Sequence, residues 1–318
     1  MPKSLLPSFS IIKHGKITFY VKDKYKDVLL SLNIESLRKE AIEKGDIRSG
    51  REPHAVIHIP ELSEERIIIR HSRHGGLFGY IAGDIYCKGN GFINELIASE
   101  TAIGKGVNTA EIIAVIKHRA FGTFYHIDVL SKEIPDSLDL VEFLTNPSLV
   151  YSLVGAGFKP APTFTDRRTI IETVAQTIRK MHDAGLYHTD LHLKNILIQS
   201  TSGNTPPSPI PSIKRGERGV LRGEKGVCEF RAYIIDMDKA KTMDVVSTKL
   251  RMQNLRRLDR SVEKLKANAK LKNATIPSKT DKLRFFKAYT GCDAEMKQYI
   301  KMPPRSYRLH RLLWRLSF

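Results

Sequence analysis

HTDLHLKNILI, at residues 188–198, and YIIDMD, at residues 233–238, are the stretches that decide the fold. The first places an acidic side chain, Asp190, five residues before an amide side chain, Asn195, and the second ends an apolar run with Asp236. The pattern H-x-D-L-x-x-x-N, followed by a strand ending in Asp, is typical of phosphoryl transfer. In that chemistry the first Asp orients and deprotonates a hydroxyl, while the Asn and the second Asp hold Mg²⁺ on nucleotide phosphates.

Both apolar runs read as short buried strands, 196–198 and 233–235. If these strands pair in a hairpin, Asn195 and Asp236 lie on neighbouring segments, where both side chains reach one metal ion. Their carboxamide and carboxylate groups are oxygen ligands, which Mg²⁺ prefers. The spacing therefore predicts a magnesium site.

Two other interpretations of residues 188–198 are weaker. His188 and His192 are four residues apart and would form a metal pair on a helix, but the following Asn-Ile-Leu-Ile favours a loop that enters a strand. The sequence also offers no second metal-binding cluster to support zinc. Asp190 would be a simple acid in a surface turn only if several matching positions coincided by chance.

Length, cysteines and hydropathy bound the class of protein. At 318 residues the chain can bury a substantial core, and one two-lobed domain suits it better than two separate domains. Cys87, Cys228 and Cys292 are isolated, which supports neither a disulfide framework nor a cysteine zinc site. We find no signal-peptide pattern and no apolar stretch near the roughly 20 residues that a spanning helix needs. A reducing, cytoplasmic setting is the expectation.

The positive charge is concentrated in the C-terminal part. From Lys239 to Phe318 there are 21 Lys and Arg residues against 6 Asp and Glu residues, so this segment carries 15 of the 18 net positive charges. Such a segment predicts a polyanionic partner, either nucleic acid or an anionic lipid or phosphorylated glycolipid. A solvated basic face without a ligand is the alternative.

The first part of the chain, to about residue 130, is predicted to be a mixed sheet with one helix. The helix covers 91–104 and carries Glu95 and Glu100. Pro135 ends the sheet, because proline cannot continue a ladder of hydrogen bonds. The strand-like runs are 55–59, 66–70, 111–116 and 125–130.

The second part is predicted to be mostly helical. A first helix ends near Gly185, which is well placed as its C-terminal cap, and delivers the chain into the His188 loop. Residues 200–231 interrupt this pattern with Ser, Thr, Pro and Gly, and are predicted to be a disordered insertion. The last helix is basic and amphipathic, so it either lies in a membrane headgroup region or packs its leucines on the protein. The predicted later helices are 252–272, 281–289 and 305–318.

These motifs resemble the protein-kinase-like superfamily, and more closely the Kdo/WaaP lipopolysaccharide kinase family, where Kdo is 3-deoxy-D-manno-octulosonic acid. The likeness covers roughly residues 45–290 and includes C-terminal motifs that kinases in general do not share. The segments that carry it are 69–77, 92–95, 188–197, 235–238, 254–261 and 281–289.

The resemblance implies an α+β, bilobal, protein-kinase-like fold. Residues 1–134 would form an N-lobe with a small antiparallel sheet and helix C. Residues 135–318 would form a mostly helical C-lobe with extra C-terminal helices.

The resemblance also implies roles for residues of the catalytic and metal motifs. Asp190 would be the general base for a sugar hydroxyl. Asn195 and Asp236 would bind Mg²⁺, and Asp238 would assist them.

A second set of implied roles concerns ATP. Arg70 stands where kinases place the phosphate-gripping lysine, and Glu95 where its helix C partner belongs. Glu133 and Ile134 would lie at the hinge and present backbone groups to adenine. Gly50 falls where a phosphate-covering loop belongs.

Three departures from the kinase pattern bear on the substrate. No G-x-G-x-x-G occurs near Gly50, and Arg70 is not equivalent to lysine although it keeps the charge. The third motif is Asp-Met-Asp, and no Ala-Pro-Glu segment follows it. Without that activation segment, a small or lipid-borne acceptor is favoured over a protein.

The resemblance therefore implies an ATP- and Mg²⁺-dependent kinase for Kdo, or less favourably heptose, in lipid A–core biosynthesis. The basic C-terminal part would then meet an anionic glycolipid, the Kdo–lipid A precursor, at the cytoplasmic face of the inner membrane, and nucleic acid is disfavoured. Two alternatives remain: a protein or aminoglycoside kinase of the same fold, and a non-catalytic, basic pseudokinase scaffold.

Overall fold

The computed structural model describes residues 7–48, 54–64, 66–72, 86–87, 91–146, 164–200, 230–267 and 277–301. The chain divides into two compact units. Unit 1 contains Met1–Pro135, Lys180–Leu191 and Ile234–Leu255, and unit 2 contains the remaining segments. Asp190 and Asp236 therefore belong to the same unit as Arg70 and Glu95.

Unit 1 is built on an antiparallel sheet, which among the described residues has eight strands. Their order is β1-β2-β7-β8-β5-β4-β3, and β6 pairs with β8. The four strands predicted from the sequence are confirmed, each within a few residues, as β4, β5, β7 and β8. The strands are β1 (Phe9–His14), β2 (Ile17–Lys22), β3 (Ile47–Arg48), β4 (His54–Ile57), β5 (Ile67–His71), β6 (Tyr86–Cys87), β7 (Ile112–Arg119) and β8 (Phe124–Lys132).

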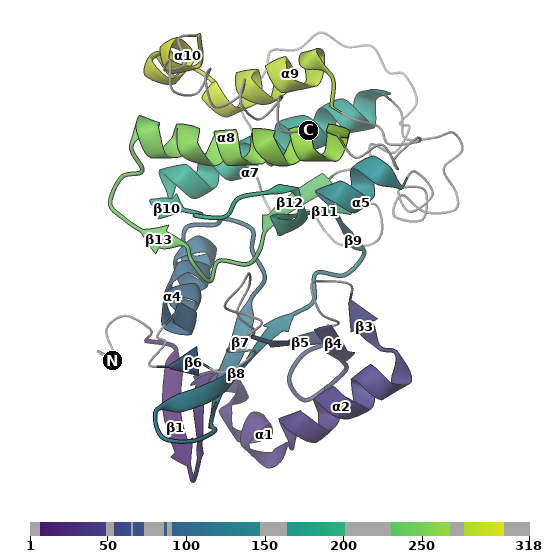
Figure 1. Cartoon of the computed structure of the whole chain (residues 1–318), viewed down its shortest axis with the longest axis vertical. Coiled ribbons are helices and arrows are strands. Elements are labelled where there is room, and N and C mark those ends of the chain that lie inside the picture. The colour runs from purple at the N-terminus through teal and green to yellow at the C-terminus, as the bar shows by residue number, and fades with distance from the viewer. Residues whose placement is uncertain are drawn as a thin grey trace, which may run out of the picture. The chain divides into compact units, whose positions relative to one another are not determined.

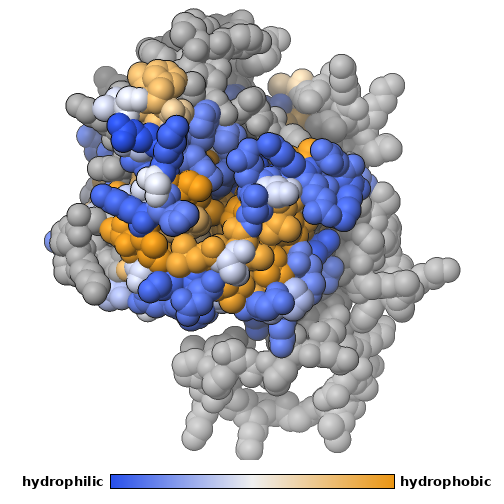
Figure 2. All heavy atoms as spheres, turned by 90° about the horizontal axis from the view of Figure 1, so that it is seen from below, coloured by the Kyte–Doolittle hydropathy of each residue, from blue (hydrophilic) through white to orange (hydrophobic). Residues whose placement is uncertain are grey.

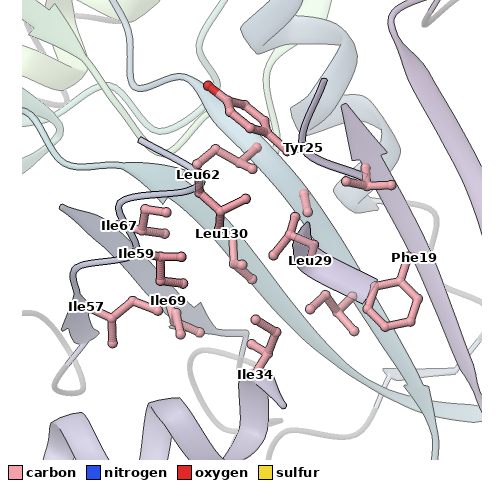
Figure 3. Close-up of a cluster of buried hydrophobic side chains, with 14 of the residues drawn as sticks. Phe19, Tyr25, Leu29, Ile34, Ile57, Ile59, Leu62, Ile67, Ile69 and Leu130 are labelled. Atoms are coloured by element: carbon pink, nitrogen blue, oxygen red, sulfur yellow. The ribbon is translucent and has the colours of Figure 1, made fainter. Parts of the chain in front are cut away.

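Helices cover both faces of this sheet (Figure 1). On one face, α1 (Lys26–Ser31) and α2 (Ile34–Lys44) bury Leu29 and Ile34 against the inward residues of the strands, as Figure 3 shows. On the other face, α4 (Gly91–Gly104) buries Phe92 and Leu96 against a second cluster. Alternation of side chains along the strands supplies both clusters, because successive residues point to opposite faces.

The expectation of a single helix in this part of the chain is wrong, since α1 and α2 precede the predicted one. The sequence did contain a signal for α2. Asn33 caps its first turn by accepting a hydrogen bond from the Ser36 amide, and Gly45 ends it in the left-handed conformation, with φ of 79°. Ile34 and Ala41 lie on its buried face at helical spacing.

Unit 2 holds a small sheet and several helices. Its strands follow the order β12-β11-β9, so the predicted pairing of the two strands that flank residues 201–229 is confirmed. Two long helices, α7 and α8, contribute residues to both units. The elements are β9 (Ser137–Asp139), β11 (Ile196–Ser200), β12 (Phe230–Ile234), α5 (Leu140–Thr145), α7 (Phe164–Asp183), α8 (Thr248–Ala267), α9 (Lys279–Thr290) and α10 (Ala294–Lys301).

The predicted helix at 281–289 is confirmed as α9 and begins two residues earlier. Ser278 and Asp281 form a capping box, in which each side chain accepts from the other residue's amide. Asp281 is buried and also pairs with Arg167 of α7, Nη2 to Oδ2, at 2.9 Å. The predicted helix at 305–318 and most of the predicted insertion lie outside the described residues.

Figure 2 views the protein from below and shows hydrophobic residues gathered between hydrophilic ones. Among the residues of α1, α2 and the nearby strands, large aliphatic side chains are 39–46% exposed: Ile11, Leu30, Ile42 and Ile47. None of the helices formed by the described residues has the length and apolar character needed to cross a membrane.

Candidate active site

Helix α7 delivers the chain to the predicted catalytic loop through Gly185. The Gly185 amide donates to the His182 carbonyl at 3.1 Å and φ is 77°, which confirms the predicted C-terminal cap. A Cβ atom at this position would lie 2.0 Å from the carbonyl oxygen of Met243. Glycine is therefore required where β10 (Leu186–Tyr187) starts to pair with β13 (Lys241–Thr242).

His188 links the two sequence motifs. Its Nδ1 accepts a hydrogen bond from the Asp190 amide at 3.2 Å, so the proton is on Nε2, which donates to the Ile235 carbonyl at 3.0 Å. Burial lowers the pKa of His188, which keeps the ring neutral in this tautomer. Because both ring nitrogens are used within the fold, His188 is better explained as a brace between Asp190 and Asp236 than as a zinc ligand.

A buried polar pair, Asn254 and His182, holds the His188 backbone in place. Asn254 of α8 donates from Nδ2 to the His188 carbonyl at 2.7 Å, and its Oδ1 lies 3.0 Å from Nε2 of His182. Asn254 and His182 are both fully buried. Beside them, the Thr189 hydroxyl donates to the Lys239 carbonyl at 3.1 Å. Sequence reasoning assigned no role to Asn254, although an amide on the apolar face of a helix is a signal for a buried hydrogen bond.

Arg70 forms ion pairs with two of the predicted site carboxylates, Glu95 and Asp236. It projects from β5, and its Nη1 lies 2.8 Å from Oδ1 of Asp236. Its Nη2 forms an ion pair with Glu95 of α4. The Arg70 side chain is 25% exposed, that of Glu95 8% and that of Asp236 39%. The structure thus brings together three residues that the sequence placed at the site.

Electrostatics show an excess of negative charge around Arg70. Burial alone would lower the pKa of Arg70, but the Glu95 and Asp236 carboxylates raise it, so the guanidinium stays charged. Burial raises the pKa of Glu95; Arg70 opposes this rise, and Asp236 and Asp238 add to it. The pKa of Asp238 is raised by burial and then by Asp236. Three carboxylates around one guanidinium suit a bound cation.

The backbone at Asp236 adopts the left-handed conformation, with φ of 61°. This conformation costs most residues about 1–2 kcal/mol, although Asp tolerates it better than most. The turn is fixed on both sides, by the bond from His188 to the Ile235 carbonyl and by the Ala240 amide, which donates to the Met237 carbonyl at 3.0 Å. Met237 is buried, which anchors the Asp-Met-Asp segment while its two carboxylates remain partly exposed.

Asn195 belongs to unit 2 and stands immediately before β11. It ends a short helical turn, η3 (Leu193–Asn195), where its amide donates to the His192 carbonyl at 3.0 Å. Asn195 is buried, whereas the Asp190 side chain is exposed. The Leu193 amide donates to the Ser261 hydroxyl of α8 at 3.3 Å, which holds this half of the loop.

The expected hinge residues lie at the end of β8. The buried Glu133 carboxylate pairs with Arg66, Nε to Oε2, at 2.6 Å, and the Glu133 amide donates to the Arg66 carbonyl at 2.7 Å. Its side chain and amide are thus engaged with Arg66. Ile134 is buried next to it. Gly50 lies outside the described residues.

Of the basic residues that the structure describes from Lys239 onward, some pair with acidic side chains and others are exposed. Some are used within the fold: Arg251 pairs with Asp183 at 2.6 Å, and Lys282 pairs with Glu263 at 2.7 Å and with Asp259. The charge that faces solvent is therefore smaller than the sequence count suggests. Exposed basic residues of the described part are Lys239, Lys241, Lys249, Arg260, Lys264, Lys279, Lys287 and Lys297.

Comparison with known proteins places this chain in a family. Residues 70–206 match the model of the lipopolysaccharide kinase (Kdo/WaaP) family. A 3-deoxy-D-manno-octulosonic acid kinase of Vibrio parahaemolyticus is 30% identical over 209 residues, which are 64% of this chain and 67% of that protein. The protein of the same name from Vibrio cholerae is 28% identical over 210 residues, 64% of this chain and 68% of that protein.

A solved structure described as WaaP in complex with acyl carrier protein is 17% identical, with a TM-score of 0.49 over 91% of this chain and 98% of that one. The family assignment rests on the Vibrio parahaemolyticus protein, because it is 30% identical to this chain and two thirds of its length is matched. This chain belongs to the lipopolysaccharide kinase (Kdo/WaaP) family.

Proposed function

We propose that this protein is an ATP- and Mg²⁺-dependent kinase that phosphorylates a hydroxyl of Kdo, with heptose the less favoured sugar, in the lipid A–core precursor of lipopolysaccharide. The names of its relatives support the acceptor. One observation carries the chemistry: Arg70, Glu95 and Asp236 form one ion-pair cluster, and His188 connects the Asp236 segment to Asp190.

The proposal includes a bilobal, protein-kinase-like fold with an N-lobe at 1–134 and a helical C-lobe at 135–318. The antiparallel sheet with α4 on one face supports the N-lobe. The helices α7, α8 and α9 support the C-lobe.

Each residue of the site would perform one task. Asp190 would orient the acceptor hydroxyl and take its proton, since its carboxylate is exposed while the His188 bond fixes its amide. Arg70 would neutralise phosphate oxygens with a guanidinium that the neighbouring carboxylates keep charged. Glu133 and Ile134 would present backbone groups to adenine, and Gly50 would lie in the loop over the phosphates.

The donor groups near Arg70 fit Mg²⁺. Asp236 and Asp238 offer carboxylate oxygens, and Mg²⁺ is commonly held by one or two carboxylates together with substrate phosphates. The motif spacing predicts that Asn195 adds an amide oxygen. Burial, and after it the neighbouring Asp236 carboxylate, raises the pKa of Asp238, and a bound cation would stabilise both charged carboxylates. When bound, the ion would neutralise charge on the transferred phosphoryl group.

The proposed acceptor is an anionic glycolipid presented at the cytoplasmic face of the inner membrane, where the protein would bind peripherally. The exposed lysines and arginines after position 239 support attraction to such a surface. Radiolabelled ATP offered with Kdo–lipid A, a protein and an aminoglycoside would separate the proposed acceptor from the alternatives.

Substitution of the proposed base tests the chemistry. In Asp190→Asn we expect kcat to fall by roughly 10²–10⁴-fold, because proton acceptance is lost. The increase in Tm caused by Mg-ATP should persist, since Asp190 does not contact nucleotide in this proposal. Asp244→Asn, the same change at an exposed position of unit 1, is the control and should keep wild-type activity. A near-wild-type rate in Asp190→Asn would contradict the assignment.

A further inference from the structure

The hairpin formed by β1 and β2 contacts the helix that carries Glu95. It extends the sheet at the edge of β7, and it precedes the residues that the family model matches. Tyr20 and Lys22 alternate along β2 and point to the face covered by α4, while Phe19 and Val21 point into the opposite core. The hairpin thus contributes side chains to the packing on both faces of the sheet.

The first contact of the hairpin with α4 is apolar. The Tyr20 ring meets Phe92 of α4 edge to face, with ring centroids 4.9 Å apart and an angle of 63° between the planes. Phe9 of β1 belongs to the same buried cluster as Phe92 and Leu96. The N-terminal half of α4, which includes Glu95, therefore packs on the hairpin.

The second contact is ionic and lies farther along α4. Lys22 is 8% exposed, and its Nζ lies 2.8 Å from Oε1 of Glu100 on α4 and 2.9 Å from Oε1 of Glu111, just before β7. The buried Oε1 of Glu100 accepts no hydrogen bond from the described residues, so the Lys22 charge compensates it. Lys22 consequently ties α4 to the edge of the sheet.

Glu100 and Glu95 are five residues apart on one helix, about 7.5 Å along its axis at 1.5 Å per residue. A shift of α4 at Glu100 therefore moves Glu95 as well. Arg70 would then keep only Asp236 as a partner, and its guanidinium would turn toward that carboxylate.

We propose that the β1–β2 hairpin is a clamp that holds α4 where Glu95 pairs with Arg70, and that Lys22 is a positioning residue acting through Glu100. The inference rests on the proposed role of Arg70 in binding nucleotide phosphates. It assigns to the N-terminal segment of this chain the task of keeping the nucleotide site assembled.

Two neighbouring carboxylates provide a matched test. Glu100 and Glu111 bind the same Lys22 at nearly the same distance, and their side chains are 25% and 24% exposed, but only Glu100 is on α4. We expect Glu100→Gln to raise KM for ATP about 10-fold with kcat within about two-fold, because saturating ATP selects the assembled state. Glu111→Gln should change KM by less than about two-fold.

Variants of Lys22 complete the design. Lys22→Met should reproduce Glu100→Gln, and Lys22→Arg should keep the wild-type KM. Lys22→Met/Glu100→Gln should be no worse than Lys22→Met, because both changes remove the same Lys22–Glu100 pair. Hydrogen exchange gives a readout independent of activity: amides of α4 should exchange faster in Lys22→Met, while those of α2 should not.

The outcomes separate this inference from the proposed function. Equal KM values in Glu100→Gln and Glu111→Gln, or unchanged exchange in α4 of Lys22→Met, would overturn the clamp. If the wild-type protein neither binds ATP nor transfers phosphate, the proposed function fails, while exchange in α4 still decides whether the hairpin holds that helix.

Discussion

Replacement of Arg70 by methionine separates the structural role of this side chain from its proposed role in binding nucleotide phosphates. Arg70→Met leaves the Glu95 carboxylate, 8% exposed, without its cationic partner. Removal of one member of a buried ion pair typically costs 3–5 kcal/mol. Since Arg70 is 25% exposed and Asp236 39% exposed, we expect the lower end, a loss of about 3 kcal/mol in the free energy of unfolding.

A second substitution should recover this loss. In Arg70→Met/Glu95→Leu no charge remains buried at this point, so the free energy of unfolding should return to within about 1 kcal/mol of the wild-type value. Neither variant should transfer phosphate, and Mg-ATP should raise the Tm of neither. The wild-type protein gains about 2.7 kcal/mol when the nucleotide is at 100 times its Kd.

Urea unfolding measures the stability of the Arg70 variants, and the change in Tm with Mg-ATP measures their nucleotide binding. Lys39→Met, which breaks an exposed ion pair with Glu35, is the control and should cost no more than about 1 kcal/mol. The reasoning fails if Arg70→Met is as stable as this control. It also fails if the double variant regains stability and still responds to Mg-ATP.

Two further predictions concern the catalytic loop. Burial lowers the pKa of His188 below its ordinary value of about 6.5, so its contribution to stability is complete above pH 6.5 and is lost as the pH falls through the folded value. The free energy of unfolding should therefore fall on acidification by up to about 1.4 kcal/mol per pH unit. His188→Gln should remove this contribution to the dependence of that free energy on pH. Identical pH dependence in His188→Gln and the wild-type protein would refute the idea that His188 is buried in its neutral form. Gly185→Ala should cost at least about 2 kcal/mol in urea unfolding, since its Cβ would overlap the Met243 carbonyl, whereas Gly45→Ala, with similar φ and open space, should cost about 1 kcal/mol. Equal costs at the two glycines would show that the overlap is relieved.

Much of the fold could be predicted because its signals are local. Runs of β-branched residues predicted four strands of the large sheet, and periodic apolar residues predicted α7 and α8. The sequence also predicted α4 and α9. The same reasoning missed β1, β2, α1 and α2. The hairpin consists of short strands whose stability depends on pairing with β7, about 100 residues away, so local pattern was a weak guide to it.

For the candidate site too, some features could be predicted from local sequence and others depend on long-range contacts. The sequence by itself determined which side chains we propose for the chemistry, because motif spacing indicates Asp190, Asn195 and Asp236, and the family resemblance implies Arg70 and Glu95. Only the tertiary structure decided how those side chains are held. Arg70 meets Asp236 across 166 residues of sequence, and Asn254 meets His188 across 66.

The physical reason is that buried polar groups must find partners wherever the fold brings them, and the sequence shows neither the distance nor the burial. The neutral tautomer of His188, the left-handed turn at Asp236 and the Lys22 contact with α4 each depend on residues from separate segments. Local pattern therefore indicated the groups that we propose to react, and long-range packing set their orientation and rigidity.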